Sequence, residues 1–356
     1  MQNYVKQINK IFQLNAYYLK NKNQFYSLFN KTHLNLYKYH IKNSNMYKLM
    51  QNGIKHKLKK LPFLPIRIFK EIELMSIPKK KIFKILLSSG TSGVQSKIFL
   101  SKYNSSIQTK VLSKLFQDFF NIKERRPMII FDRSNIIKDR NLFSARGAGI
   151  LGFSIFGKDH IYAFDENNKF RKNEIINYLK KYKKEKIIVF GLTNIVWENL
   201  ENLKNENFIK ENLKNSILIH GGGWKKLSVN NISQNKFKKT LKQRLGITSV
   251  YNYYGMVEQT GSIFFECEKG YFHTSTFSDI KTIDKYFNEL NYGKRGIIQL
   301  ISLLPTSYPG HNLLTEDEGI IYGKDTCSCK RHGKYFKIIG RIKRSETRGC
   351  SDNYDL

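Results

Sequence analysis

A short apolar run that breaks into small hydroxyl residues and glycines most constrains this chain. Residues 86–97 read LLSSGTSGVQSK, so two leucines lead into a loop that ends on Lys97. Glycines let successive backbone N–H groups turn toward one anion, hydroxyls add neutral donors, and a lysine adds a point charge. The loop is not a Walker A motif, because Gln95 stands where that motif requires its second glycine. The stretch predicts a phosphate-gripping loop, with a serine- and glycine-rich surface turn as the alternative.

Further apolar runs alternate with segments of helical spacing. Residues 128–132, 187–191 and 217–220 are short buried-strand patterns, and residues 107–120 and 194–203 have the spacing of helices. This alternation predicts the α/β fold class, in which ligands bind at the carboxyl ends of the strands. The loops that follow these strands are therefore the places to look for function.

The amino-terminal part has a different character. Residues 1–53 show a helical pattern without proline, whereas residues 61–65 (LPFLP) carry two prolines that exclude a helix interior and favour an extended connection. We expect a helical segment over residues 1–60, an α/β core over residues 61–340 and a carboxy-terminal tail over residues 341–356.

The charge balance is strongly basic. The chain has 62 Lys and Arg against 28 Asp and Glu, a formal net charge of +34. A basic nucleic-acid-binding protein is one interpretation, but the lysines are spread along the whole chain and no zinc-finger, RNP or basic-zipper pattern occurs. We expect no nucleic-acid partner, and we consider an acidic partner such as an acyl carrier protein instead. Without a signal-peptide pattern or a membrane-span pattern, the sequence predicts a cytoplasmic protein.

Three later loops carry candidate ligand-binding residues. Residues 221–223 are glycines, which can lie against a planar ligand or form an ordinary strand-to-helix turn. In residues 250–261 (VYNYYGMVEQTG), Tyr254 can stack on a base and Glu258 can hold Mg²⁺ beside phosphates. Asp317, in a cluster of carboxylates, can accept hydrogen bonds from ribose hydroxyls, although a solvated acidic turn is the alternative.

These stretches occur in the order found in a known superfamily. Residues 88–93 (SSGTSG), 254–258 (YGMVE), 315–317 and 340–341 resemble motifs of the adenylate-forming superfamily, whose members activate a carboxylate as an acyl-AMP. Within it, three further stretches are similar to the acyl-protein synthetases of bacterial luminescence systems. Those synthetases are long-chain-fatty-acid–luciferin-component ligases related to phenylacetate–CoA ligases. The three stretches are residues 143–152 (FSARGAGILG), 220–226 (HGGGWKK) and 348–352 (RGCSD).

The resemblance covers the chain from about residue 61 onward. It implies an adenylate-forming amino-terminal core that lacks the full carboxy-terminal lid domain, with ATP and Mg²⁺ as cofactors. Lys225, Lys226 and Lys343 are candidates to replace the catalytic lysine of that lid. The glycines at 221–223 would lie against adenine, and Arg341 would join Asp317 on the ribose. The predicted cofactor-binding residues are Ser88, Ser89, Gly90, Thr91, Ser92, Gly93, Gly221, Gly222, Gly223, Tyr254, Gly255, Asp317 and Arg341, and the predicted catalytic residues are Lys97, Glu258 and Cys350.

The resemblance also implies a function in two steps. A fatty acid, or another carboxylic acid, would be activated by ATP and then passed to a thiol, for delivery to an acyl reductase. We expect Cys350 to accept the acyl group, because two arginines, Arg344 and Arg348, favour its thiolate and Gly349 removes bulk beside it, whereas Asp352 opposes the arginines. An unreactive thiol at the chain end is the alternative, and an acyl–CoA ligase is the alternative enzyme.

Two features remain open at this stage. Residues 143–156 and 190–197 are candidates for the acyl pocket, with plain core packing as the alternative. Three cysteines and a histidine form a candidate structural zinc site, with reduced, partly buried thiols as the alternative and His332 as another fourth ligand. The predicted zinc ligands are Cys267, His273, Cys327 and Cys329.

Overall fold

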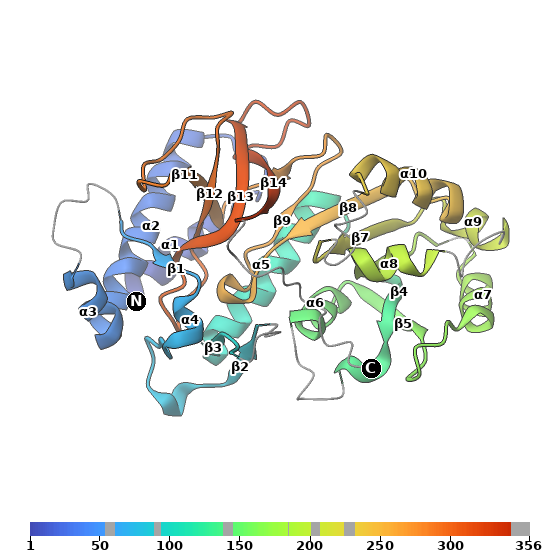
Figure 1. The fold of residues 1–356 in the computed structure, drawn as a ribbon, viewed down its shortest axis with the longest axis horizontal. Coiled ribbons are helices and arrows are strands. Elements are labelled where there is room, and N and C mark those ends of the chain that lie inside the picture. Colours follow the sequence, from blue (N-terminus) through green and yellow to red (C-terminus); the bar gives the residue numbers. More distant parts are fainter. Residues whose placement is uncertain are drawn as a thin grey trace. The chain divides into compact units, whose positions relative to one another are not determined.

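The computed structural model describes residues 1–53, 61–88, 94–137, 145–183, 185–200, 207–223 and 232–342 (Figure 1). The chain divides into two compact units. The first unit is Met1–Asn121 with Gly255–Glu346, and the second is Ile122–Tyr254 with Thr347–Leu356. The domain boundaries that the sequence predicts, at residues 60 and 340, remain predictions.

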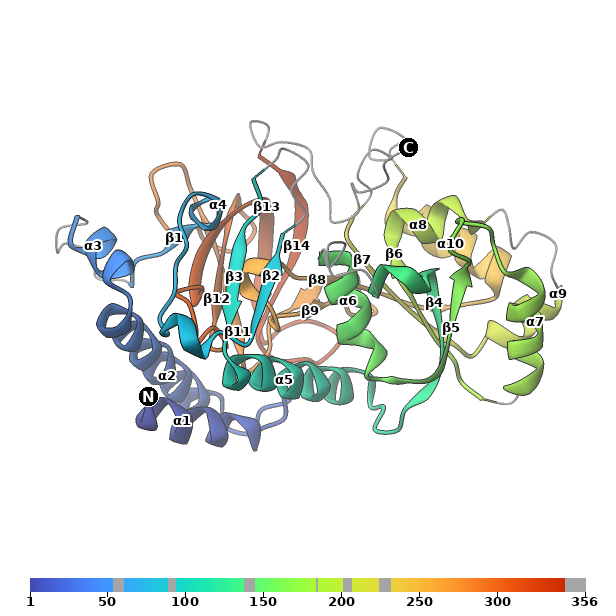
Figure 2. The ribbon, with the colours of Figure 1, turned by 90° about the horizontal axis from the view of Figure 1, so that it is seen from below.

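The first unit begins with three helices, as the proline-free pattern predicts. They are α1 (Gln2–Phe12), α2 (Lys22–Asn43) and α3 (Asn45–Gly53). Asn21 caps α2, because its side chain accepts the N–H of Gln24 at 3.0 Å. Apolar residues three or four positions apart, such as Phe25 and Phe29, bury one face of α2, which lies beside α1 (Figure 2).

A buried histidine anchors α2 to the rest of the first unit. His40 Nε2 lies 3.0 Å from the carbonyl oxygen of Pro305 and therefore donates a hydrogen bond to it. His40 Nδ1 lies 2.7 Å from Ser76 Oγ and accepts a hydrogen bond from that hydroxyl. Burial lowers the pKa of His40 to about 3, so the ring stays neutral. His40 also stacks on His311, with ring centroids 4.9 Å apart. Polar contacts as well as apolar burial thus fix this helix.

An antiparallel sheet forms the centre of the first unit, in the order β10-β14-β13-β12-β11, with β1 added in parallel to β13. The extended connection predicted at residues 61–65 is confirmed, since β1 pairs Leu64 with Leu313. The long antiparallel strands were not foreseen. The strands are β1 (Leu64–Pro65), β10 (Phe272–His273), β11 (Ser278–Ile283), β12 (Arg295–Ser302), β13 (Asn312–Lys324) and β14 (Lys334–Arg341).

A two-stranded hairpin and α5 (Lys102–Phe120) complete this unit. Ser101 caps α5 by accepting the N–H of Asn104 at 3.1 Å. The fully buried Asn104 amide then accepts the N–H groups of Thr306 and Ser307, each at 3.0 Å, so a connecting loop is tied to the helix. The remaining elements are α4 (Ile68–Glu71), η1 (Lys79–Lys81), β2 (Lys84–Leu87), β3 (Lys97–Leu100), η5 (Val257–Gln259) and β9 (Phe264–Phe265).

The second unit carries the predicted parallel sheet. Its strands pair in the order β5-β4-β6-β7-β8, all parallel, and every strand predicted in this region is confirmed. Their continuous apolar runs suit a sheet that is covered on both faces. The strands are β4 (Arg126–Arg133), β5 (Gly157–Phe164), β6 (Ile188–Leu192), β7 (Ile217–Gly221) and β8 (Ser249–Tyr254).

Helices cover the two faces of the parallel sheet (Figure 2). The main core packs strand residues such as Val189 and Leu218 against helix residues such as Val196 and Leu241. Among the described residues, no helix is both long and apolar enough to cross a bilayer. The elements are η2 (Ser134–Ile137), α6 (Ala145–Ser154), α7 (Lys172–Lys181), α8 (Thr193–Glu198), α9 (Asn207–Leu213) and α10 (Gln234–Leu245).

Candidate functional site

The predicted phosphate loop joins two antiparallel strands. Leu87 at the end of β2 is paired with Lys97 at the start of β3. The base of the loop is closed by Ser88 N–H donating to the carbonyl of Ser96 at 3.1 Å, and by Ser96 N–H donating to Ser88 Oγ at 2.9 Å. Residues 89–93, which include the two loop glycines, lie outside the described residues. The described part is therefore the narrow base of a hairpin.

Lys97 projects from this hairpin into solvent. Its Nζ lies 3.2 Å from Glu73 Oε1, and the two side chains are 54% and 49% exposed. An ion pair this exposed contributes about 0–1 kcal/mol. Lys97 can therefore exchange Glu73 for a phosphate oxygen at little cost.

Glu258 is the most unusual predicted site residue, because its carboxylate is buried in the first unit. The residue is 6% exposed, and burial raises its pKa, while a contact with Ser96 and the charges of Lys70 and Arg341 act in the opposite direction. Among the described residues, no cation lies within ion-pair distance of it. Ser96 Oγ, also buried, has no partner at ordinary hydrogen-bond geometry yet lies near enough to affect this carboxylate. The base of the hairpin and Glu258 thus come together.

The backbone around Glu258 is held in place. Its neighbour Gln259 is fully buried, and the side-chain amide donates to the carbonyls of Leu300 at 3.2 Å and Gly310 at 2.9 Å. A Cβ on Gly310 would lie 2.8 Å from the carbonyl oxygen of Glu258, so glycine is required there. The pKa of the buried Tyr308 hydroxyl is raised mainly by burial and to a smaller extent by the charge of Glu258, which shows that the two groups interact. A carboxylate held this firmly suits a divalent cation.

Asp317 and Arg341 are partners across two strands. They are paired in register on β13 and β14, and Arg341 Nε lies 3.6 Å from Asp317 Oδ1. Thr315 Oγ1 accepts the N–H of Asp317 at 3.1 Å and lies 2.9 Å from the carbonyl oxygen of Ile298. The alternative of a solvated acidic turn is wrong, because Asp317 lies within a long strand. The pairing brings the two predicted ribose-binding side chains together.

The three predicted adenine-binding glycines lie in the second unit, and each is a glycine for a different structural reason. Gly221 ends β7, and a Cβ there would lie 2.5 Å from the ring of Tyr253. Gly222 and Gly223 have φ angles of 82° and 68°, a region that favours glycine, and a Cβ on Gly223 would meet nothing within 4 Å. Of the three, Gly223 is therefore the one with no described residue beside its Cβ position. Tyr254 ends β8 in the same unit.

The predicted acyl-pocket segments are partly filled by aromatic rings. Phe153 stacks on Phe190 with centroids 4.7 Å apart and lies 4.9 Å from Tyr253. Phe153 and Phe190 are 2% and 1% exposed. These two phenylalanines are therefore packed in the core, as the alternative interpretation predicts. The predicted residues Cys350, Lys225, Lys226 and Lys343 lie outside the described residues.

Sequence reasoning missed a buried ion pair in the second unit. Arg146 donates to both carboxylate oxygens of Asp132, each at 2.7 Å, and the side chains are 4% and 2% exposed. The pair joins the carboxyl end of β4 to the first turn of α6. Removing one partner of such a pair would leave the other as a buried charge without compensation. Each residue type was visible in the sequence, but no spacing signal connects them.

The cysteines and histidine of the predicted zinc site do come together in the first unit. Their ligand atoms all lie within 4.8 Å of one another, and all four residues are buried. Cys329 Sγ is 3.3 Å from His273 Nε2. Hydrogen bonding from Cys267, and then from His273, holds the pKa of Cys329 below its usual range. Three thiols and one imidazole fit the donor set of a closed structural zinc site.

One neighbour of the cluster supports a zinc site, whereas the second nitrogen of His273 does not. Arg331 lies beside Cys329, ion-paired with Glu268 at 2.9 Å, and its charge can balance thiolates. His273 Nδ1 is buried without a hydrogen-bond partner, whereas metal-bound histidines usually donate from the second nitrogen. His332 as a fourth ligand is wrong, because its Nδ1 accepts the N–H of Leu19 at 2.6 Å and the residue is not part of the cluster.

Solved structures with the same architecture are adenylate-forming ligases. An open conformation of 2-hydroxyisobutyryl-CoA ligase with 2-HIB-AMP and CoA matches with a TM-score of 0.69 at 14% identity, over 93% of this chain and 75% of that one. ATP-bound MatB from Rhodopseudomonas palustris matches with a TM-score of 0.50 at 15% identity, over 75% of this chain and 49% of that one. The chain thus spans three quarters of the length of one relative and about half of the other. These similarities show the fold of the adenylate-forming ligases.

The particular family follows from the sequence. The family model "Acyl-protein synthetase, LuxE" matches residues 6–355, and the chain belongs to that family. It is therefore an ATP-dependent, acyl-AMP-forming ligase, as the motif order predicts. No curated protein matches the chain by sequence.

Replacing Glu258 with Gln tests the buried carboxylate. Because its pKa is raised above the ordinary 4.5, the folded state holds this proton more tightly than the unfolded state, and stability falls as pH rises through that range. We expect Glu258→Gln to raise the free energy of unfolding of the ligand-free protein by about 1 kcal/mol at pH 8, with little difference at pH 4.

Denaturant unfolding at both pH values measures this difference. The control is Glu73→Gln, at a half-exposed carboxylate, which should change stability by less than about 0.5 kcal/mol at either pH. A Glu258→Gln protein that is less stable than the unsubstituted protein at pH 8 would show that the ionised carboxylate is satisfied by its surroundings.

Proposed function

We propose that this protein activates a fatty acid, or another carboxylic acid, with ATP and then transfers the acyl group to its own Cys350. The observation that carries the first step is the buried Glu258, which lies beside Ser96 at the base of the predicted phosphate hairpin. A carboxylate without a direct cation partner, next to a loop rich in anion donors, suits a metal–phosphate complex. Two structures of similar fold were solved with nucleotide ligands: 2-hydroxyisobutyryl-CoA ligase with 2-HIB-AMP and CoA, and MatB with ATP.

In the first step, a carboxylate oxygen of the substrate attacks the α-phosphorus of ATP, and the bond to the pyrophosphate oxygen breaks. Bound Mg²⁺ would supply charge neutralisation on the phosphates. Glu258 would hold that ion, and Lys97 would leave Glu73 to contact a phosphate oxygen. Asp317 would accept hydrogen bonds from the ribose, held in place by Arg341 and Thr315. Gly223 and Tyr254 are the candidates to contact the adenine.

In the second step, the thiolate of Cys350 attacks the acyl carbonyl carbon, a thioester forms, and AMP leaves with the electron pair of the broken bond. The thioester would then be delivered to an acyl reductase. A second candidate acceptor is CoA, because the relative 2-hydroxyisobutyryl-CoA ligase was solved with CoA. The net charge of +34 supports recruitment of an acidic partner, such as an acyl carrier protein, in the cytoplasm.

We also propose that Cys267, His273, Cys327 and Cys329 hold a structural Zn²⁺. The support is the gathering of four buried ligand atoms within 4.8 Å, from two segments far apart in the sequence, the turn and short strand at residues 267–273 and the turn at residues 327–329. Zinc would bind these segments together, and the positive charge of Arg331 would offset the thiolates.

Acid-dependent exchange of pyrophosphate into ATP tests the first step. We expect the protein to catalyse this exchange with a fatty acid, and Lys97→Ala to slow it about tenfold to a hundredfold, because a charge-assisted contact contributes roughly 1.5–3 kcal/mol. The control is Lys79→Ala, at an exposed lysine of η1. Equal exchange rates in the two folded variants would exclude Lys97 from the site, and no acid-dependent exchange in the unsubstituted protein would refute adenylation.

A labelled fatty acid tests the acceptor. Incubation with ATP should leave a covalent label on the protein that survives a denaturing gel and is released by hydroxylamine. Cys350→Ala should abolish this label while pyrophosphate exchange continues, because the thiol acts only after acyl-AMP has formed. A persistent label would place the acceptor elsewhere, and a thioester found on added CoA would favour the CoA ligase.

Metal analysis tests the zinc site. We expect freshly purified protein to contain close to one zinc per chain, and Cys329→Ser to lose it with a fall of several degrees in the midpoint of thermal unfolding. Ser328→Ala, at the exposed residue between the two cysteines, is the matched control and should keep both the metal and the midpoint. If the purified protein contains no zinc and Cys329→Ser does not change the midpoint of thermal unfolding, the cysteines are reduced thiols and the zinc proposal is wrong.

A further inference from the structure

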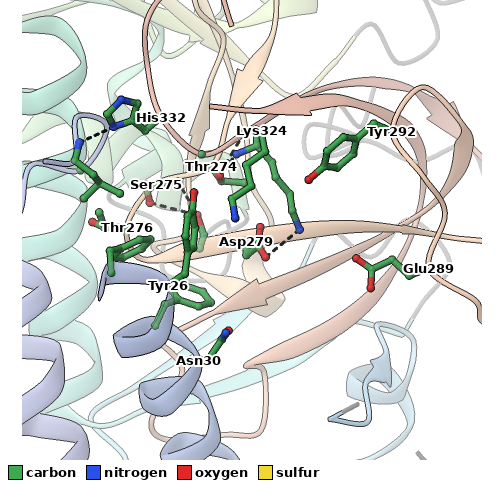
Figure 3. Close-up of a pocket in the computed structure, with 17 residues that line it drawn as sticks. Tyr26, Asn30, Thr274, Ser275, Thr276, Asp279, Glu289, Tyr292, Lys324 and His332 are labelled. Atoms are coloured by element: carbon green, nitrogen blue, oxygen red, sulfur yellow. Dashed lines mark hydrogen bonds and ion pairs between the residues drawn. The ribbon is translucent and has the colours of Figure 1, made fainter. Parts of the chain in front are cut away.

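A cavity of about 250 Å³ lies in the first unit, and none of the predicted nucleotide-binding residues lines it (Figure 3). One wall comes from the amino-terminal segment and α2, and the other from residues 274–279 and the adjoining ends of β13 and β14. The amino-terminal wall is apolar where Leu19, Phe25 and Phe29 line it. The opposite wall carries polar and charged side chains. A cavity with one apolar and one charged wall suits an amphipathic ligand.

Two carboxylates and two lysines line this cavity, Asp279 and Glu289 with Lys324 and Lys334, but their ion pairs are distributed unevenly. Three carboxylates lie in or next to it, and each has its own lysine. The pairs are Asp279 with Lys334 at 3.1 Å, Glu289 with Lys281 at 2.9 Å, and Asp325 with Lys22 at 3.9 Å. Lys324, the last residue of β13, is a fourth lysine, and no carboxylate of the described residues lies within ion-pair distance of it. Lys324 is therefore the lysine of the lining that has no ion-pair partner among the described residues.

Lys324 is held in a defined position. Its Nζ lies 3.3 Å from the centre of the Tyr26 ring, and the Tyr26 hydroxyl lies 3.3 Å from both carboxylate oxygens of Asp325. Burial lowers the pKa of Lys324, although the charges of Asp279 and Asp325 act in the opposite direction. A partly desolvated ammonium gains more from an added anion than a lysine in free solvent does. The tyrosine ring orients this ammonium before any ligand arrives.

A second polar group of the cavity also lacks a partner. Thr276 is 1% exposed, and its Oγ1 has no hydrogen-bond partner among the described residues, although the backbone N–H of the same residue donates to the carbonyl of Ala16 at 3.1 Å. Buried hydroxyls are normally hydrogen-bonded, and an orphan hydroxyl in a cavity wall is a position where a ligand or a water can bind. Thr276 is thus an observation independent of the charge count.

We infer that this cavity binds a small organic anion, whose charged group lies on Lys324 and whose apolar body lies against Phe25 and Phe29. At about 30 Å³ for each water in the liquid, the cavity corresponds to roughly eight waters, so the ligand has about eight to ten non-hydrogen atoms. A medium-chain or aromatic carboxylate has this size and chemistry. The inference does not rest on the proposed adenylation, because no predicted nucleotide-binding residue lines the cavity.

Calorimetric titration with octanoate, in the absence of ATP, tests the site. We expect Lys324→Met to weaken octanoate binding at least about tenfold, because methionine keeps an apolar stem but removes the charge. Lys337→Met is the matched control, since Lys337 also lies over a tyrosine ring, 5.0 Å from the centre of Tyr271, but does not line the cavity. Octanamide, which has the same shape without the charge, should bind the unsubstituted protein as weakly as octanoate binds Lys324→Met.

A second variant guards against a folding defect in the first. Thr276→Val removes the unpartnered hydroxyl, and we expect it to keep or raise the free energy of unfolding while weakening octanoate binding. Equal octanoate affinity in Lys324→Met, Lys337→Met and the unsubstituted protein would overturn the inference and assign binding to the substrate site. Acid-dependent pyrophosphate exchange is a separate readout, which Lys324→Met should retain, so failure of the adenylation proposal would be seen in a different assay.

Discussion

The buried carboxylate of Glu258 is the interaction on which the candidate site depends. A charge in such a place lowers stability unless it is neutralised or paired, and here the surroundings supply only partial compensation, from Ser96 and from the more distant Lys70 and Arg341. The protein tolerates this because Gln259 fixes the same short helix to the sheet through two hydrogen bonds to carbonyl oxygens. A site that is unfavourable when empty and rigidly held is suited to bind a cation with its anionic ligand.

The rest of the first unit keeps this arrangement rigid through buried polar contacts. Asn104 satisfies the backbone of the loop at Thr306 and Ser307, and His40 joins α2 to the carbonyl of Pro305 in the same region. Both contacts secure the segment that leads to Tyr308 and Gly310, which pack around Glu258. Apolar burial alone does not specify such a unique geometry, whereas fully satisfied polar groups do.

The same unit contains two further features that adenylation does not require. The cysteine cluster joins two turns through thiols and an imidazole, and the cavity beside Lys324 is walled partly by His332 and Gly333 from one of those turns. Lys324 stands on β13, the strand that also carries Asp317.

Local sequence determined much of what is found here. Short apolar runs predicted the parallel strands β4, β6 and β7 because such strands are buried on both faces, and the motif order predicted the family. Sequence patterns missed the antiparallel sheet, because bulges interrupt the pairing of β12, β13 and β14 and the long strands β12 and β13 do not alternate regularly between buried and exposed residues. The role of Gly221 was also out of reach, since the reason for it is the ring of Tyr253 on a neighbouring strand.

The sequence by itself determined which side chains were available: a loop rich in anion donors, a carboxylate after an aromatic strand, three cysteines and a histidine. Only the tertiary structure decided which of them meet. It placed Ser96 beside Glu258, paired Asp317 with Arg341 across two strands, gathered Cys267 with Cys329, and left Lys324 without an ion-pair partner among the described residues. The physical reason is that burial, charge balance and strand register are properties of residues far apart in the chain, and no local pattern encodes them.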